Sequence, residues 1–218
     1  MGSGFKTFTA GAVLTASEVN NYLMEQAIPV FATTAARDAA ITAPEEGMTA
    51  YVTGTKLTYV YTGAAWFSNA GSVLQTVTTH LPGIYTHSTN IALSAITGLS
   101  VAITPRSTVS KILVSFNILV SGSQSLIIYG NLRRGATNIA QPTTGAMFTG
   151  TYNSSIGGSS DFGHPSLSFL DSPATAAAVT YSLTIGCNTA TCYVNRRGDS
   201  ADYTGTSSIT VQEIAVSL

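Results

Sequence analysis

The sequence predicts a mainly β protein, with an antiparallel jelly-roll sandwich preceded by a small module of short helices and a β-hairpin. From Val73 onward, short stretches of alternating apolar and polar residues follow one another, separated by turn residues every dozen or so positions. Before Val73, apolar residues recur at helical spacing or in a few short strands. We therefore expect two domains, residues 1–71 and 72–218.

The N-terminal segment opens with a short helix in "TASEVNNYLMEQAI". Thr15 or Ser17 can cap this helix, with Glu18 reaching back from the first turn, and Pro29 ends it. A second helical stretch, "TTAARDAA", precedes the short strands "MTAYVT", "KLTYVYT" and "TGAAWF". A module of this size buries little apolar surface, so we expect it to lean on neighbours.

The C-terminal segment is a series of strands, of which "KILVSFNILVSG" has the clearest pattern. One face of this strand is expected to carry Ile112, Val114, Phe116, Ile118 and Val120, and the other Leu113, Ser115, Asn117 and Leu119. An antiparallel sandwich buries only one face of each sheet. Apolar residues on the second face therefore predict contact with another subunit.

The composition also favours an assembly. Charged residues make up 9% of the 218 residues, and the formal net charge is -1; a typical protein has about a quarter charged residues. Because charge protects a free surface from association, we expect a homotrimer packed around a three-fold axis. The alternative is a monomer coated with Ser, Thr, Asn and Gly.

The charge and hydropathy patterns argue against two classes of partner. Lys and Arg total 9 and form no stripe that could follow a phosphate backbone, so we expect no nucleic acid partner. No run of 18 apolar residues occurs, and the start "MGSGFKTFTAG" lacks the apolar segment of a secretory signal. We therefore expect no membrane insertion.

The chain lacks the usual groupings of catalytic side chains. Glycoside hydrolysis needs two facing carboxylates, and Asp199 with Asp202 is better explained as a pair of turn formers. His164 has no nucleophile elbow to accompany it, and no glycine-rich phosphate loop occurs. We expect no enzyme, no catalytic residues and no cofactor.

Two cysteines, Cys187 and Cys192, stand in "GCNTATCYV". Their spacing is not C-x-x-C and the three histidines lie far off in sequence, so no metal site is predicted. We expect the two to flank a hairpin loop and face each other across a strand pair, as a candidate disulfide. Two buried free thiols are the alternative.

The N-terminal runs "GFKTFTAGAVLTASEVNNYLMEQAIPVF" and "TTAARDAAITAPEEGMTAYVTGTKLTYVYTGAAW" resemble the opening module of many bacteriophage tail and fibre proteins. The shared pieces are F-x-AG-x-VLTA-x-x-VN-x-YLM, AARDAAI, P-x-EGM-x-x-YV and VY-x-G-x-AW. In such proteins this module looks like the attachment end. The resemblance implies docking on other phage tail or head proteins.

The C-terminal part resembles a family found as the distal domain of phage fibres, which is similar to the C1q/TNF-like trimeric jelly rolls. The matching segments are "ITGLSVAITPRSTVSKILVSFNILVSG", "LRRGATNIA", "SFLDSPATAAAVTYSLTIG" and "NRRGDSADYTGTSSITVQEIA". The resemblance transfers no catalytic residue. It implies a virion protein, assembled in the cytoplasm of a bacterial host.

The segment "NRRGDSADY" contains Arg197-Gly198-Asp199, the tripeptide that animal adhesion receptors bind. We interpret it as turn chemistry, with Gly198 supplying a positive φ. Exposed loops carry recognition, so residues 153–158 and 197–204 are expected to contact a host surface glycan or protein. The candidate contact residues are Asn153, Ser155, Arg197, Asp199, Asp202 and Tyr203.

These observations lead to one functional prediction and one alternative. The prediction is a homotrimeric tail fibre or tail-tip protein, anchored by its N-terminus and contacting the host surface through its C-terminal domain. The alternative is a capsid decoration or head-fibre protein. A virion depolymerase is disfavoured, because the sequence has neither a carboxylate cluster nor β-helix repeats.

Overall fold

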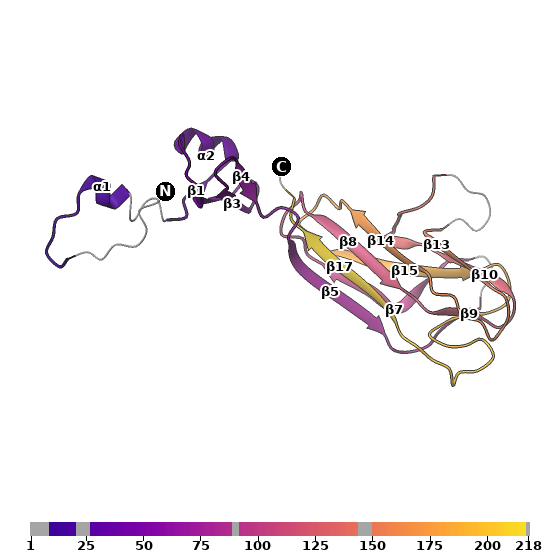
Figure 1. Ribbon diagram of the computed structural model, residues 1–218. Coiled ribbons are helices and arrows are strands. Elements are labelled where there is room, and N and C mark those ends of the chain that lie inside the picture. The colour runs from indigo at the N-terminus through magenta and orange to yellow at the C-terminus, as the bar shows by residue number, and fades with distance from the viewer. Residues whose placement is uncertain (1–8, 21–26, 89–91, 144–149, 217–218) are drawn as a thin grey trace. The chain divides into compact units, whose positions relative to one another are not determined.

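A computed structural model describes residues 9–20, 27–88, 92–143 and 150–216 (Figure 1). The chain divides into two compact units. The first unit comprises residues 1–72 with 215–218, and the second comprises residues 73–214. Among the described ranges, no helix is long and apolar enough to cross a bilayer.

In its described residues, the first unit holds two short helices and a four-stranded sheet of order β1-β2-β3-β4. The elements are α1 (Ala16–Val19), β1 (Val30–Phe31), α2 (Thr34–Ala40), β2 (Thr49–Val52), β3 (Leu57–Tyr61) and β4 (Trp66–Ser68). Thr15 caps α1: its hydroxyl accepts from the Glu18 amide at 3.2 Å, and the Glu18 carboxylate accepts from the Thr15 amide at 2.8 Å. The capping box is therefore confirmed, with Thr15 rather than Ser17 as the cap. Residues 21–26, where the helix was expected to continue, lie outside the described residues.

The helix α2 packs on the sheet through an arginine. The Arg37 side chain is 5% exposed, and its guanidinium carbon lies 4.7 Å from the Tyr59 ring centroid and 4.5 Å from that of Trp66. A cation over aromatic rings is stabilised by their quadrupoles, and more strongly so when it is desolvated. Asp38 accepts from Arg37 Nη2 at 2.7 Å and balances the charge.

The regular elements of the second unit are all strands in the part of it that the structure describes. They are β5 (Val73–Leu81), β6 (Tyr85–His87), β7 (Ser94–Ile103), β8 (Lys111–Asn117), β9 (Val120–Gly122), β10 (Leu126–Gly130), β11 (Leu132–Arg134), β12 (Thr137–Ile139), β13 (Tyr152–Ile156), β14 (Ser166–Asp171), β15 (Val179–Cys187), β16 (Cys192–Val194) and β17 (Ser207–Ile214).

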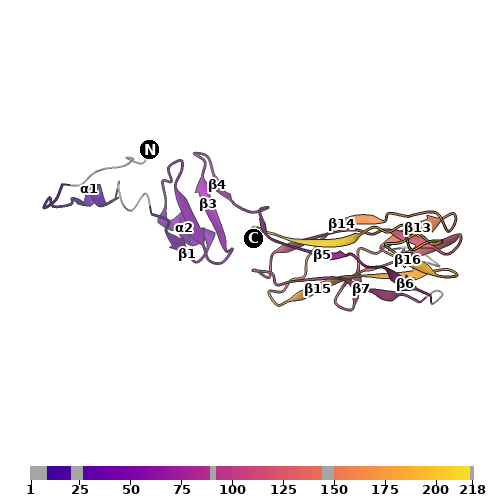
Figure 2. The same ribbon diagram turned by 90° about the horizontal axis from the view of Figure 1, so that it is seen from below.

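The pairing of the long strands is that of a jelly roll. The outermost strands in sequence, β5 and β17, pair with each other, and so do the next two, β7 and β15. Further inward, β8 pairs with β14 and β10 pairs with β13. All four pairings are antiparallel, so the second unit is one long hairpin rolled into two large sheets, with β6, β16 and β9 forming a small third sheet. Figure 2 shows these sheets edge-on, with β5 and β14 in one layer and β7 and β15 in the other.

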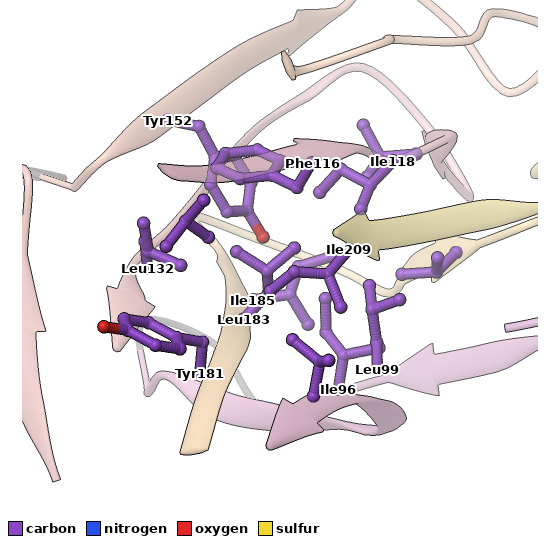
Figure 3. Close-up of a cluster of buried hydrophobic side chains, with 14 of the residues drawn as sticks. Ile96, Leu99, Phe116, Ile118, Leu132, Tyr152, Tyr181, Leu183, Ile185 and Ile209 are labelled. Carbon is purple, nitrogen blue, oxygen red and sulfur yellow. The ribbon is translucent and has the colours of Figure 1, made fainter. Parts of the chain in front are cut away.

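The core fills the space between the two sheets. Leu99, Ile185 and Ile209 are fully buried, and the rings of Phe116 and Tyr152 meet with centroids 5.7 Å apart (Figure 3). Side chains from both sheets point into this one cluster, so the sandwich has a single apolar interior. The predicted fold class, mainly β with a jelly-roll sandwich, is confirmed.

The face assignment in "KILVSFNILVSG" is correct only in part. Ile112, Val114, Phe116, Ile118 and Val120 are all buried as predicted. Strand β8 ends at Asn117, although the Ile118 amide still donates to the Pro165 carbonyl at 3.1 Å and continues the pairing with the β14 segment. Leu119 is the exception, because it was expected on the second face and is buried. Val120 begins another strand, β9.

Candidate functional site

The strand register gathers the predicted contact loop and its neighbours at one end of the second unit. Ile214 of β17 pairs with Val73, so the chain enters and leaves the sandwich at the same end. Ser208 pairs with both Asn117 and His80 at the other end, which we call the distal end. The connection from β16 to β17, residues 195–206, and that from β13 to β14, residues 157–165, both lie there.

The 195–206 loop rises from a rigid base. Asn195 is fully buried with φ at 64°, in the left-handed region that asparagine tolerates. Its Nδ2 donates to the carbonyls of Leu81 at 2.6 Å and Gly83 at 2.9 Å, and its Oδ1 accepts from the Ser207 hydroxyl at 2.5 Å. These bonds satisfy the buried amide and fix where the loop begins.

Gly198 is needed for close approach, which corrects the expectation that it supplies a positive φ. Gly198 is buried, and the residues with positive φ do not include it. A Cβ atom on Gly198 would overlap the Gly122 carbonyl oxygen and lie 2.8 Å from the Ser159 carbonyl oxygen. The Asp199 amide donates to that Ser159 carbonyl at 3.1 Å, so the tripeptide is held against two other segments.

Within the tripeptide the two charges meet each other. Arg197 Nε donates to Asp199 Oδ1, and the Arg197 guanidinium carbon lies 3.8 Å from the centroid of the Tyr203 ring. The Arg197 amide also donates to the Tyr203 carbonyl at 2.9 Å. Asp202 has a local partner of its own, because Ser200 Oγ donates to it at 3.1 Å. Arg197, Asp199, Asp202 and Tyr203 thus form one small surface, on which the Tyr203 residue is 54% exposed.

Asn153 and Ser155 do not belong to a loop, contrary to the prediction. Both lie within β13 and are exposed, while Tyr152 and Ile156 are buried. The strand pairs with β10 along its whole length. Its polar residues mark the outer face of a half-buried strand, and the connecting loop begins only at Gly157.

The loop after β13 carries an aromatic residue that the sequence analysis did not select. Phe162 is 38% exposed, and its ring centroid lies 6.4 Å from that of His164. Asp161 next to it is exposed as well. The sequence could have pointed to Phe162, because it is a large apolar residue in the Gly- and Ser-rich stretch "GGSSDFGHP". Phe162 and Tyr203 are the exposed aromatics of the two distal loops.

The two cysteines do not face each other across a strand pair. Cys187 ends β15, whereas Cys192 begins β16, which pairs with β6 and β9 in a separate three-stranded sheet. Both are buried free thiols. Burial, and then the neighbouring Cys187 thiol, to which it is hydrogen-bonded, raise the pKa of the Cys192 thiol far above its ordinary value. A neutral buried thiol is unreactive, and oxidation of the pair to a disulfide stays a prediction.

Across the residues that the structure describes, no group of three or more His, Cys, Asp or Glu side chains could hold a metal ion.

Comparison with known proteins gives matches among solved structures only. No family model matches the sequence, and no curated protein matches it. A structure of infectious bursal disease virus, Gt strain, matches with TM-score 0.38 and 8% identity over 72% of this chain and 42% of that chain. The Gx strain gives 0.35 and 10% over 72% and 42%, and T=1 particles derived from the virus give 0.34 and 5% over 70% and 39%. The chain thus spans less than half of each of these three chains, and likenesses this weak carry no inference about function.

Proposed function

We propose that the protein is a bacteriophage virion structural protein, a homotrimeric tail fibre or tail-tip protein without catalytic activity. In this proposal the first unit docks on the virion and the distal end of the second unit contacts the host surface. The proposal is supported by the two resemblances in the sequence, which together cover nearly the whole chain, and by the surface features below.

The trimer is proposed chiefly because of the residues on the outer face of the sheet β14-β8-β17-β5. By alternation and register, this face carries Ser166, Ser168, Leu170, Leu113, Ser115, Asn117, Ser208, Thr210, Gln212, Thr76, Thr78 and His80, together with Lys111 at the end of β8 that pairs with Ile214. Lys111 is the one charged residue of this set, and its Nζ donates to Ser172 Oγ at 2.5 Å. We call this surface the hydroxyl face.

Polar groups on the hydroxyl face bind one another across the strands. The hydroxyls of Ser115 and Ser168 lie 2.9 Å apart, and those of Thr78 and Thr210 lie 3.0 Å apart. Burying a polar group costs little when it is already hydrogen-bonded, whereas burying an unpaired charge costs a great deal. Apart from Lys111 at one end, the hydroxyl face is uncharged; it therefore suits a subunit interface and fits the low charge of the whole chain.

The first unit has an exposed apolar face of its own. Val60 pairs with Thr49 on one side and with Phe67 on the other, so the three side chains lie in one row on the face of the sheet opposite Tyr59. Val60 is 41% exposed, Phe67 70% and the nearby Val30 64%. Exposed apolar patches of this kind are typical of protein interaction sites, which supports docking of this unit on a virion partner.

Electron cryomicroscopy of the whole particle tests the proposal. The expected result is density for this chain in the tail, with the second unit at its tip. Density on the head surface would instead favour the decoration or head-fibre alternative, and absence from purified particles would overturn both.

A further inference from the structure

We propose that the second unit binds a carboxylate-bearing sugar in a hollow beside Arg134, at the end of the sandwich opposite the distal end. The hollow has a volume of about 390 Å³. Its lining residues are Arg134, Gly135, Pro173, Thr175, Ala178, Val179 and Thr180. Cavities of this size take small ligands. The proposal concerns a surface that the tail-fibre proposal does not use.

Arg134 is held in place by a buried carboxylate and by a backbone carbonyl. Its Nη1 donates to both carboxylate oxygens of Asp171, at 2.9 Å and 3.0 Å, and to the Ser172 carbonyl at 3.2 Å. Asp171 is 6% exposed and also accepts from the Tyr181 hydroxyl at 2.7 Å. A side chain fixed in this way loses little conformational entropy when a ligand binds, which is the advantage of preorganisation.

Tyr181 completes this support. Its ring is fully buried, and its hydroxyl points away from the apolar cluster (Figure 3). Burial, followed by the hydrogen bond to Asp171, raises the pKa of Tyr181 well above its ordinary value. The phenol therefore stays protonated and donates, which leaves the Asp171 carboxylate committed to Tyr181 and Arg134.

The other edge of the Arg134 guanidinium is unused. All three of its hydrogen bonds come from Nη1, while Nε and Nη2 bond to none of the described residues. The Arg134 side chain is 32% exposed. The parallel N–H groups of Nε and Nη2 match the two oxygens of a carboxylate. Arg134 thus binds the buried Asp171 through Nη1, and its Nε and Nη2 edge can bind a second carboxylate.

The rest of the hollow favours a sugar over an inorganic anion. Pro173 and Ala178 offer apolar surface to the C–H groups of a sugar ring, and Thr180 is exposed with a hydroxyl that bonds to none of the described residues. Arg134 is the one cation among the lining residues, and Asp171 already balances its charge. Lys111 lies outside this lining, and its Nζ donates to Ser172 Oγ at 2.5 Å. A phosphate dianion would be poorly neutralised there, whereas a singly charged sugar acid needs only the free edge and nearby hydroxyl partners.

Titration calorimetry of the full-length protein tests the proposal, with glucuronate as the probe and glucose, acetate and inorganic phosphate as comparisons. Glucuronate is expected to bind at least about tenfold more tightly than each comparison, which is the effect of losing one charge-assisted hydrogen bond or more. Equal binding of acetate would show a bare carboxylate site that fits a protein side chain, and tighter phosphate binding would show an anion site. Either result, or no glucuronate binding, overturns the proposal.

Variants separate recognition from stability. Arg134→Lys keeps the charge and can still pair with Asp171, but it lacks the two-donor edge, so glucuronate binding should fall about tenfold. Arg133→Lys is the matched control, since Arg133 bonds to Asn138 instead, at 3.0 Å, and binding should stay unchanged. If Arg134→Lys fails to fold, Thr180→Val replaces it and should weaken glucuronate binding several-fold. Unchanged binding in the folded variant would overturn the proposal.

Discussion

Gly198 lies so close to the backbone of Gly122 that any side chain on Gly198 would overlap the Gly122 carbonyl oxygen. The contact joins the tripeptide Arg197-Gly198-Asp199 to the end of β9. We predict that Gly198→Ala lowers the free energy of unfolding by about 1–3 kcal/mol, the usual effect of forcing extra volume into packed structure. Urea unfolding, monitored by circular dichroism, measures this change.

Gly83→Ala is the matched control. A Cβ atom on Gly83 would meet nothing within 4 Å, and its carbonyl can still accept from Asn195. Its stability should stay within about 0.5 kcal/mol of the parent. If Gly198→Ala is as stable as Gly83→Ala, the close approach is not what requires glycine at position 198.

We predict that Asp199 contributes little to stability and nothing to divalent-cation-dependent adhesion. Its partner Arg197 is 26% exposed and Asp199 itself is 37% exposed, so water screens the pair and its loss should cost less than about 1 kcal/mol. Because Arg197 and Asp199 bind each other within the loop, we predict that Asp199→Asn leaves adhesion of animal cells to the immobilised protein unchanged. A chelator-sensitive adhesion that disappears in Asp199→Asn would show receptor binding instead.

Stability should fall in alkaline solution, beginning near the ordinary thiol pKa of 9.0. Burial raises the folded pKa of Cys192 above the unfolded value. Above pH 9 the unfolded chain therefore loses this proton while the folded chain keeps it, and stability declines as pH rises. The urea midpoint should drop between pH 9 and 10, and this drop should be smaller in Cys192→Ala. Equal pH dependence in the two proteins would contradict the assignment.

The fold could be predicted because its signals are local. Alternation with period two placed Ile112, Val114 and Phe116 in the core, and a Thr15–Glu18 pair three residues apart marked a helix start. The order of sheet pairing was not predicted, because alternation alone does not say which strands are neighbours.

The rest depended on contacts between distant segments. Gly198 meets Gly122 and Ser159, and Arg37 meets Tyr59 and Trp66, pairs that no spacing in the sequence relates. Cys187 and Cys192 were predicted to flank a hairpin because they are close in sequence. Their strands, β15 and β16, belong to different sheets. Asn153 and Ser155 were predicted to lie in a loop because they are polar. The exposed face of a strand is polar too, so polarity alone does not distinguish the two.

The hydroxyl face gives a direct test of the trimer. Thr210 lies on this face in the central strand β17, and Thr210→Lys would place an unpaired charge in the proposed interface, at a cost of several kcal/mol per buried ion. We predict that light scattering at micromolar concentration gives a trimer for the parent and a folded monomer for Thr210→Lys. Ser100→Lys is the control, because Ser100 is exposed on β7 in the other sheet, and it should remain a trimer. A parent that is monomeric would refute the proposal.

Competition for adsorption tests most directly the claim that the protein contacts the host through its second unit. The second unit has its own core, so we predict that a fragment of residues 73–218 folds and trimerises by itself. Added in excess, the full-length chain and the fragment should both slow adsorption of intact phage to host cells, and monomeric Thr210→Lys should do so poorly because it lacks avidity. A folded trimeric fragment that leaves adsorption unchanged but binds empty capsids would contradict the claim and identify a head protein.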